Sequence, residues 1–322
     1  MMINKLNKLA ARRIPFFFMI DYDMEKPVLL PLSQIDPARI KYNFNGQKNF
    51  TPPEHYQKLQ HIDKELPAFN EYKKAFHKIQ NHFINGNSYL VNLTFAIPIY
   101  TAMTLEDIFY NSRAKYKILY KNRFVCFSPE IFVKIKNGYI YSYPMKGTID
   151  STLPDAARTI INDSKEKAEH ITIVDLIRND LNISCTRVKV NRFRYIDKLT
   201  TSEKELLQVS SEIEAQLPAD YLDRLGNIIY SLLPAGSISG APKKKTLEII
   251  NETENYKRGY YTGIAALFNG SELDSCVMIR FIEKQPKKMV YKSGGGITVY
   301  SSAAKEYQEL KDKIYVPVSG NN

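Results

Sequence analysis

The pattern of apolar positions along this chain predicts an alternation of helices and strands. Helical spacing is clearest over residues 68–85, where the recurring apolar side chains are Phe69, Tyr72, Phe76, Ile79 and Phe83. Strands are predicted where apolar residues run together or alternate, over residues 16–20, 88–100 and 123–143. The last of these stretches contains Asn137-Gly138, a dipeptide that strongly favours a hairpin turn.

The same patterns continue through the second half of the chain. Helices are predicted over residues 155–181 and 218–233, from Pro242 onward, and after a cap at Ser301 or Ser302. Strands are predicted over residues 185–215, 260–268, 273–282 and 288–291. No repeat and no linker is apparent between these elements. We therefore expect one large α+β domain over residues 1–322.

Charge narrows the possible partners only slightly. The chain has 45 Lys and Arg against 34 Asp and Glu, a formal net charge of +11. Such a field attracts nucleic acid, and it attracts a small polyanionic substrate equally well. The basic residues are scattered and form only short clusters, without a recognised nucleic-acid motif. We therefore expect no nucleic-acid partner.

Hydropathy and cysteine usage predict a cytoplasmic protein. No apolar run approaches the ~18 residues of a membrane span, and the first residues lack the features of a signal peptide. We expect no membrane partner. Cys126, Cys185 and Cys276 are far apart in sequence and lie among apolar or β-prone neighbours, so we expect buried thiols rather than disulfides or zinc ligands.

Two pairs of glutamates have the spacing of neighbours on a helix face. Glu166 and Glu169 lie early in one predicted helix, and Glu306 and Glu309 lie early in another. Four converging carboxylates would repel one another unless a hard cation such as Mg²⁺ lay among them. Helix starts also favour acidic residues for capping, with Asp163 or Ser164 as a cap here, so one pair alone does not predict a metal site.

Two glycine-containing segments bring the backbone within reach of an anionic ligand. Residues 234–243 read P-A-G-S-I-S-G-A-P-K and come directly before a predicted helix, whose first N–H groups attract anions. At Gly294-Gly295-Gly296 the backbone can approach a ligand closely for a different reason, because glycine has no side chain. Each segment alone is weak evidence, since glycine loops more often serve only as turns.

The chain resembles the chorismate-utilising enzymes over about residues 85–315. The resemblance is carried by these two glycine-containing segments, by the last helix, and by two further motifs, E-H-I-T-I-V-D-L-I-R-N-D-L at 169–181 and R-G-Y-Y-T-G at 258–263. The resemblance implies antiparallel sheets packed face to face with helices outside. Residues 86–316 would form the catalytic core and residues 1–85 a shortened N-terminal part of the same domain. It also implies a Mg²⁺ site for the ring carboxylate of chorismate, with the ligands Glu169 and Glu309 supported by Glu166 and Glu306.

Further roles follow from the same resemblance. The implied substrate-binding residues are Thr148, Ser237, Tyr261, Arg280, Gly294, Gly296 and Lys313. Arginine suits the binding of a carboxylate because its planar guanidinium donates two parallel hydrogen bonds. Glu130, in F-S-P-E-I-F, matches the general acid that protonates the departing 4-hydroxyl of chorismate. That role requires a raised pKa, which burial among apolar neighbours produces.

Lys146, in P-M-K-G-T, matches the position where aminodeoxychorismate synthases carry lysine and anthranilate synthases carry alanine. Its neutral amine, with a pKa lowered by burial near Mg²⁺, would add to C2 of the ring, and ammonia would then attack C4. The resemblance therefore implies an aminodeoxychorismate synthase component I on the route to 4-aminobenzoate and folate. Ammonia would come from a separate glutamine amidotransferase subunit. The alternatives are an anthranilate synthase component I and, from another class, a basic nucleic-acid-binding protein.

The chain departs from the family pattern at two positions and at its front. Leu90 stands where hydrolytic members have a lysine that activates water, so we expect no hydrolytic activity, although amine-transferring members usually have glutamine there. Gln208 replaces a histidine linked to the elimination of pyruvate, which favours amination without aromatisation. Much of the usual N-terminal region, with its tryptophan-feedback motif, is absent, so we expect no inhibition by tryptophan.

Overall fold

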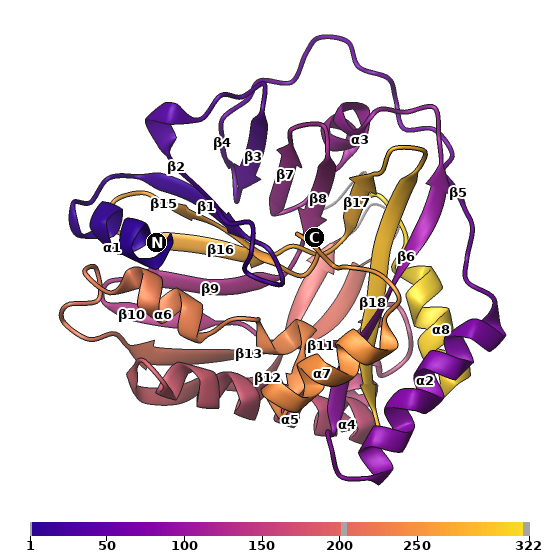
Figure 1. The fold of residues 1–322 in the computed structure, drawn as a ribbon. Coiled ribbons are helices and arrows are strands. Elements are labelled where there is room, and N and C mark those ends of the chain that lie inside the picture. Colours follow the sequence, from indigo (N-terminus) through magenta and orange to yellow (C-terminus); the bar gives the residue numbers. More distant parts are fainter. Residues whose placement is uncertain (1, 201–204, 318–322) are drawn as a thin grey trace.

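The computed structural model describes residues 2–200 and 205–317, and within these ranges the strands form two antiparallel sheets (Figure 1). The strands of the first sheet are β1 (Phe16–Ile20), β2 (Val28–Pro31), β9 (Ile131–Lys136), β10 (Tyr139–Ser142), β11 (Met145–Asp150), β12 (Thr186–Thr200), β13 (Glu205–Gln216), β15 (Ile264–Phe268) and β16 (Leu273–Val277). Their order is β11-β13-β10-β9-β16-β15-β1-β2, and β12 also pairs with β13. The turn between β9 and β10 places Asn137 and Gly138 at positive φ, which confirms the predicted hairpin.

The second sheet contains the glycine-rich strand near the end of the chain. Its strands are β3 (Ile40–Phe44), β4 (Gln47–Lys48), β5 (Asp63–Lys64), β6 (Leu90–Tyr100), β7 (Tyr116–Tyr120), β8 (Phe124–Ser128), β14 (Gly240–Ala241), β17 (Phe281–Lys284) and β18 (Met289–Thr298). Their order is β14-β6-β18-β17-β8-β7-β3-β4, and β5 also pairs with β6. The three glycines therefore lie within a paired strand and not in the loop expected from the sequence.

Helices cover the outer faces of both sheets. They are α1 (Met2–Ala11), α2 (Phe69–Ile84), α3 (Leu105–Asn111), α4 (Ala156–Asn162), α5 (Ser164–Asn182), α6 (Leu225–Ser231), α7 (Lys243–Thr253) and α8 (Ala303–Asp312), with 3-10 turns η1 (Leu32–Gln34) and η2 (Gly236–Ile238). Apolar residues of α1, α5 and α6 pack on the first sheet, and those of α2, α3, α7 and α8 pack on the second. The α+β architecture with helices outside is thereby confirmed.

The first strand shows why the two sheets pack face to face. Phe16 and Phe18 point toward the helices, whereas Phe17 and Met19 join a core shared with β3, β7 and β8 of the second sheet. A strand buried on both faces has no polar alternation, and its sequence reads as a continuous apolar run. The apolar run that predicted the strand therefore also accounts for its burial on both faces.

Several predicted elements are wrong in extent. The strand expected over residues 260–268 begins only at Ile264, the strand expected over 288–291 continues to Thr298, and the helical stretch 155–181 is divided into α4 and α5. The strand expected over residues 273–282 breaks after Val277, because the chain crosses there from the first sheet to the second. Arg280 lies in this crossover with a φ of 53°, an uncommon value for a residue with a side chain. The helix expected over 218–233 begins only at Leu225, and residues 218–224 form turns and connecting backbone. The sequence also did not predict α1.

Several local predictions are confirmed. Helix α2 covers residues 69–84, close to the range 68–85 that its apolar spacing predicted. Asp163 caps α5 by accepting a hydrogen bond from the amide of Glu166 at 2.8 Å. Cys126, Cys185 and Cys276 are buried free thiols. Within the described ranges no helix combines the length and apolarity needed to cross a bilayer.

Candidate active site

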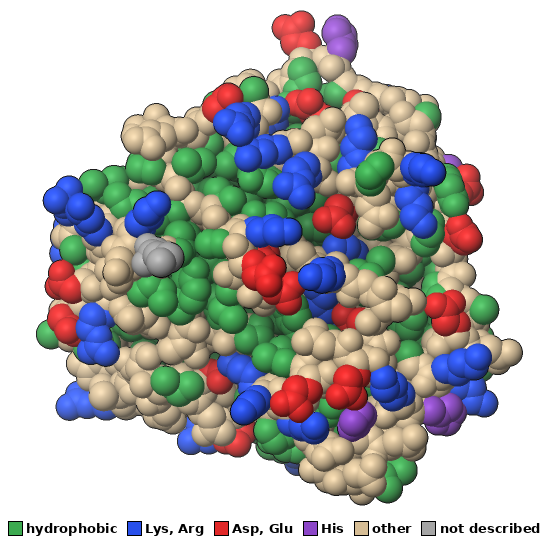
Figure 2. All heavy atoms as spheres, viewed as in Figure 1, with side chains coloured by type: hydrophobic (Ala, Val, Ile, Leu, Met, Phe, Trp, Pro, Cys, Tyr) green, Lys and Arg blue, Asp and Glu red, His purple; other side chains and the backbone are tan. Residues whose placement is uncertain are grey.

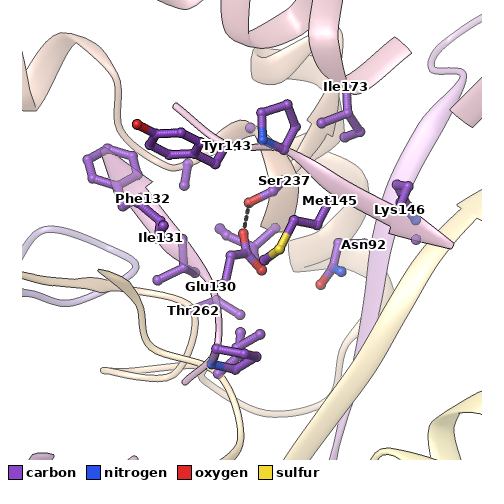
Figure 3. A pocket seen from close by; sticks show the side chains of 18 of the residues that line it. Asn92, Glu130, Ile131, Phe132, Tyr143, Met145, Lys146, Ile173, Ser237 and Thr262 are labelled. Carbon is purple, nitrogen blue, oxygen red and sulfur yellow. Dashed lines mark hydrogen bonds between the residues drawn. The ribbon is translucent and has the colours of Figure 1, made fainter. Parts of the chain in front are cut away.

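A cavity of about 270 Å³ opens where the chain passes between the two sheets (Figure 3). Glu130 lies at one crossover, between β8 and β9, and Arg280 lies at another, between β16 and β17. The predicted site residues that line this one cavity are Glu130, Lys146, Thr148, Ser237, Tyr261, Arg280, Gly294, Gly296, Glu309 and Lys313. The structure thus brings together residues from seven separate segments. Glu166, Glu169 and Glu306 lie outside the cavity lining.

Glu130 is held at the cavity by its neighbours. Its amide donates to the hydroxyl of Ser128 at 3.0 Å, and its carboxyl accepts a short hydrogen bond from Ser237 (Figure 3). Burial raises the pKa of Glu130 above its ordinary value, although the Ser237 hydrogen bond and nearby cations oppose that rise. The raised pKa agrees in direction with the expectation for a general acid.

Lys146 lies on β11 beside the carboxylate of Glu169. Its Nζ donates to Oε2 of Glu169 at 3.0 Å. Burial lowers the pKa of Lys146, but the carboxylates of Glu169 and Glu309 outweigh it, and the net pKa is above the ordinary value. The sequence did not reveal how closely these carboxylates surround the amine. The lowered pKa expected beside a bound Mg²⁺ stays a prediction.

The four glutamates lie around the cavity in two places. On α5, Glu169 is 4 % exposed and reaches Lys146, while Oε2 of Glu166 would lie 3.3 Å from a Cβ added to Gly147. On α8, Glu306 is also 4 % exposed and Glu309 pairs with Lys313 at 2.5 Å. Within residues 2–200 and 205–317, no three acidic, histidine or cysteine side chains are arranged to hold a metal ion.

The donor chemistry of these glutamates fits Mg²⁺, which prefers carboxylate oxygens. Glu169 and Glu306 are buried carboxylates, and buried charge requires an opposite charge nearby. Lys146 supplies that charge to Glu169 in this arrangement. The Mg²⁺ site implied by the resemblance stays a prediction.

Arg280 presents its guanidinium to the same cavity. The guanidinium lies over the ring of Tyr315, 5.2 Å from its centroid. Its Nε is buried and has no hydrogen-bond partner among the described residues. A buried donor without a partner is costly, and a carboxylate placed in the cavity would satisfy it. The backbone of Arg280 is in the left-handed region, at the crossover between the two sheets.

The glycines of β18 make room beside the cavity. Gly294 pairs with Thr94 of β6, and a Cβ at Gly294 would lie 2.3 Å from the carbonyl oxygen of Leu93. On the next residue, a Cβ at Gly295 would lie 3.5 Å from both the Glu309 carboxylate and the Lys313 amine. Side chains are therefore excluded at Gly294, and those of α8 can reach the strand at Gly295.

Sequence reasoning missed some of the residues that line the cavity. They include Asn92, Met145, Asp180, Thr262 and Lys292. Asp180 pairs with Lys243 at 2.8 Å, which fixes α5 against the segment that carries Ser237. Asp180 lies in the motif at residues 169–181, which supports the family resemblance and assigns Asp180 no role of its own. The apolar pattern of β6 gives no reason to select Asn92.

Surface charge is mixed on the face shown in Figure 2. Lys and Arg side chains are interspersed with Asp and Glu over the described part of this face, without a continuous basic stripe. On this face the basic side chains are thus dispersed, in line with their scattered positions in the sequence.

Comparisons with known proteins give matches over most of the chain. The sequence model described as chorismate binding enzyme matches residues 21–319. An uncharacterized PabA-like protein of Pasteurella multocida is 47 % identical over 320 residues, covering 98 % of both chains. Aminodeoxychorismate synthase component 1 of Bacillus subtilis is 30 % identical over 259 residues, which cover 76 % of this chain and 54 % of that protein.

A solved structure extends the comparison to the fold. Anthranilate synthase component I from Streptococcus pneumoniae TIGR4 matches with a TM-score of 0.68 and 25 % identity, over 81 % of this chain and 60 % of that one. The fold and the family match together cover nearly all of the described residues. This chain belongs to the chorismate binding enzyme family.

Proposed function

We propose that this chain is an aminodeoxychorismate synthase component I, which converts chorismate and ammonia to 4-amino-4-deoxychorismate and water. The observation that carries the proposal is the placement of Lys146 and Glu130 on one cavity, with Arg280 on the same lining. A nucleophilic amine, a carboxyl with a raised pKa and a cation for a carboxylate suit substitution on an anionic ring. The relative from Bacillus subtilis supports the same assignment.

In the proposed reaction, Lys146 acts in its neutral form: the lone pair of Nζ forms a bond to C2 while the ring double bonds shift and the bond between C4 and its hydroxyl breaks. Glu130 gives its proton to that hydroxyl, which leaves as water. Ammonia then bonds to C4, the double bonds shift back, and Lys146 leaves C2 with its electron pair. The new ammonium at C4 returns one proton to Glu130. The net change replaces one hydroxyl by an amino group and releases one water.

Substrate binding is assigned to the remaining residues of the lining. Arg280, Tyr261 and Lys313 would bind carboxylates, together with Ser237, Thr148 and the backbone at Gly294 and Gly296. Glu169 and Glu309, supported by Glu166 and Glu306, would hold Mg²⁺; when bound, that ion supplies positive charge for the ring carboxylate and offsets the carboxylates around Lys146. A glutamine amidotransferase subunit would supply ammonia, and the product would lead toward 4-aminobenzoate and folate.

Anthranilate synthase component I is the alternative, because the solved structure from Streptococcus pneumoniae bears that name. Two residues of the cavity favour 4-amination without aromatisation. Lys146 occupies the position where anthranilate synthases carry alanine, and Gln208, which also lines the cavity, replaces the histidine linked to loss of pyruvate.

The product formed from chorismate, Mg²⁺ and ammonium tests the proposal. We expect 4-amino-4-deoxychorismate, identified by mass after separation, whereas fluorescent anthranilate would establish the alternative. Lys146→Ala should lower the rate of 4-amination at least about tenfold, which corresponds to ~1.4 kcal/mol in the barrier. Trapping an adduct on the wild-type lysine would support the covalent step. Lys136→Ala, at an exposed lysine of β9, is the control. An unchanged rate in Lys146→Ala would exclude that step.

Arg280→Ala should weaken the binding of chorismate. Hydrogen bonds between charged partners contribute roughly 1.5–3 kcal/mol, so we expect KM for chorismate to rise about 10- to 100-fold. The measurement is initial rate against chorismate concentration at saturating ammonium. Arg123→Ala makes the same exchange at an exposed position and should leave KM within about twofold of wild type. Equal KM values in the two variants would show that Arg280 does not bind the substrate.

A further inference from the structure

Asn92 is a polar residue of the cavity that takes no part in the reaction or the substrate binding proposed for the other lining residues. It lies on β6 and lines the cavity together with Glu130 and Lys146. Its backbone is fully used, because the amide donates to Ser239 and the carbonyl accepts from Arg258. Its side-chain Oδ1 is buried and has no hydrogen-bond partner among the described residues. Such an acceptor is costly unless a ligand supplies the missing donor.

The strand register places Asn92 close to the amine of Lys146. Asn92 is directly opposite Gly296 in the pairing of β6 with β18, and opposed residues point to the same face of a sheet. A Cβ on Gly296 would lie 3.3 Å from Nζ of Lys146 and 3.4 Å from Cδ1 of Leu90. In the view of Figure 3, the Asn92 amide lies between the Glu130 carboxyl and Lys146.

We propose that the amide oxygen of Asn92 binds the ammonia that attacks C4. This inference rests on the proposed function and names the residue that positions its nucleophile. Ammonia has three N–H donors and fits a carbonyl oxygen. An amide oxygen carries no charge, so it holds ammonia without stabilising ammonium, which lacks the lone pair needed for attack. Leu90, two residues earlier on the same face of β6, is an apolar neighbour that offers no base for activating water.

The test compares two KM values in one set of variants. In Asn92→Leu, which keeps the approximate size and removes the acceptor, we expect KM for ammonium to rise roughly tenfold while KM for chorismate stays within about twofold. All rates are taken at one pH, so that the fraction of free ammonia is constant. Asn92→Asp keeps an oxygen acceptor but adds a charge that stabilises ammonium, so its KM for ammonium should stay within about threefold of wild type while kcat falls.

Further variants distinguish a failure of the proposed role of Asn92 from a general effect of the substitution and from a failure of the proposed function. Asn251→Leu makes the same exchange at an exposed position of α7 and should leave both KM values unchanged. If Asn92→Leu does not fold, as judged by its melting transition, Asn92→Ala takes its place. An unchanged KM for ammonium in the folded variant, or a rise confined to KM for chorismate, overturns the role of Asn92 alone. Failure of the wild type to aminate chorismate overturns the proposed function and this inference with it.

Discussion

Glu130→Gln is expected to slow the amination of chorismate by about 10²- to 10⁴-fold, the usual contribution of a positioned general acid. Glutamine keeps the size of the side chain and can still accept the hydrogen bond from Ser237. It has no carboxyl proton to give to the departing hydroxyl. The loss should therefore appear in kcat, with KM for chorismate within about threefold of wild type.

The pH profile separates this role from simple packing. Burial raises the pKa of Glu130, and a general acid acts only in its protonated form. Activity is therefore present below that pKa and lost as the pH rises through it. We expect the wild type to lose kcat on the alkaline side at saturating free ammonia, and Glu130→Gln to lack that pH-dependent fall. A single-turnover pH series measures both.

Glu272→Gln provides the matched control for Glu130→Gln. Glu272 is an exposed glutamate that pairs with Lys136 at 3.7 Å, far from the cavity lining. Its replacement should leave kcat within about twofold of wild type. If Glu130→Gln retained the wild-type kcat and the same alkaline fall, another group would have to protonate the leaving hydroxyl.

The elements that could be predicted are those whose structure depends on neighbouring residues in the sequence. The face of α2 and the turn at Asn137 and Gly138 follow from short-range spacing and turn chemistry, and both are confirmed. The break after Val277 is a long-range event, because apolar residues continue from Cys276 to Ile279 while the strand partners change from one sheet to the other. Nothing in the local pattern marks that change.

The candidate site divides in a similar way. Residues within family motifs, such as Glu130, Lys146 and Arg280, were assigned from the resemblance, and the structure places them on one cavity. Asn92 could not be selected, because its exceptional property is a buried oxygen without a partner, which only three-dimensional packing reveals. The carboxylates that raise the pKa of Lys146 could not be identified for a related reason, since they are distant from it in sequence.

One buried ion pair beside the cavity is expected to contribute more to stability than any exposed pair. The side chains of Arg258 and Glu254 are 1 % and 3 % exposed, and their closest atoms are 2.6 Å apart. Glu254 also accepts hydrogen bonds from the amide and hydroxyl of Thr94, while Arg258 donates to the carbonyls of Asn92 and Ile238. The pair thus joins the end of α7 to β6 and to the segment that carries Ser237.

Glu254→Ala should lower the free energy of unfolding by about 3–5 kcal/mol, because it leaves the Arg258 guanidinium buried without its counter-charge. Denaturant unfolding followed by circular dichroism measures the loss, provided that both proteins unfold in one transition. Glu248→Ala removes the exposed partner of Lys245 on the same helix and should cost only ~0.2–1 kcal/mol. Similar losses of unfolding free energy in the two variants would mean that water or a rearrangement of Arg258 compensates for the missing Glu254 carboxylate. A large loss confined to Glu254→Ala would show that the buried pair joining the end of α7 to β6 stabilises the fold far more than an exposed pair on the same helix.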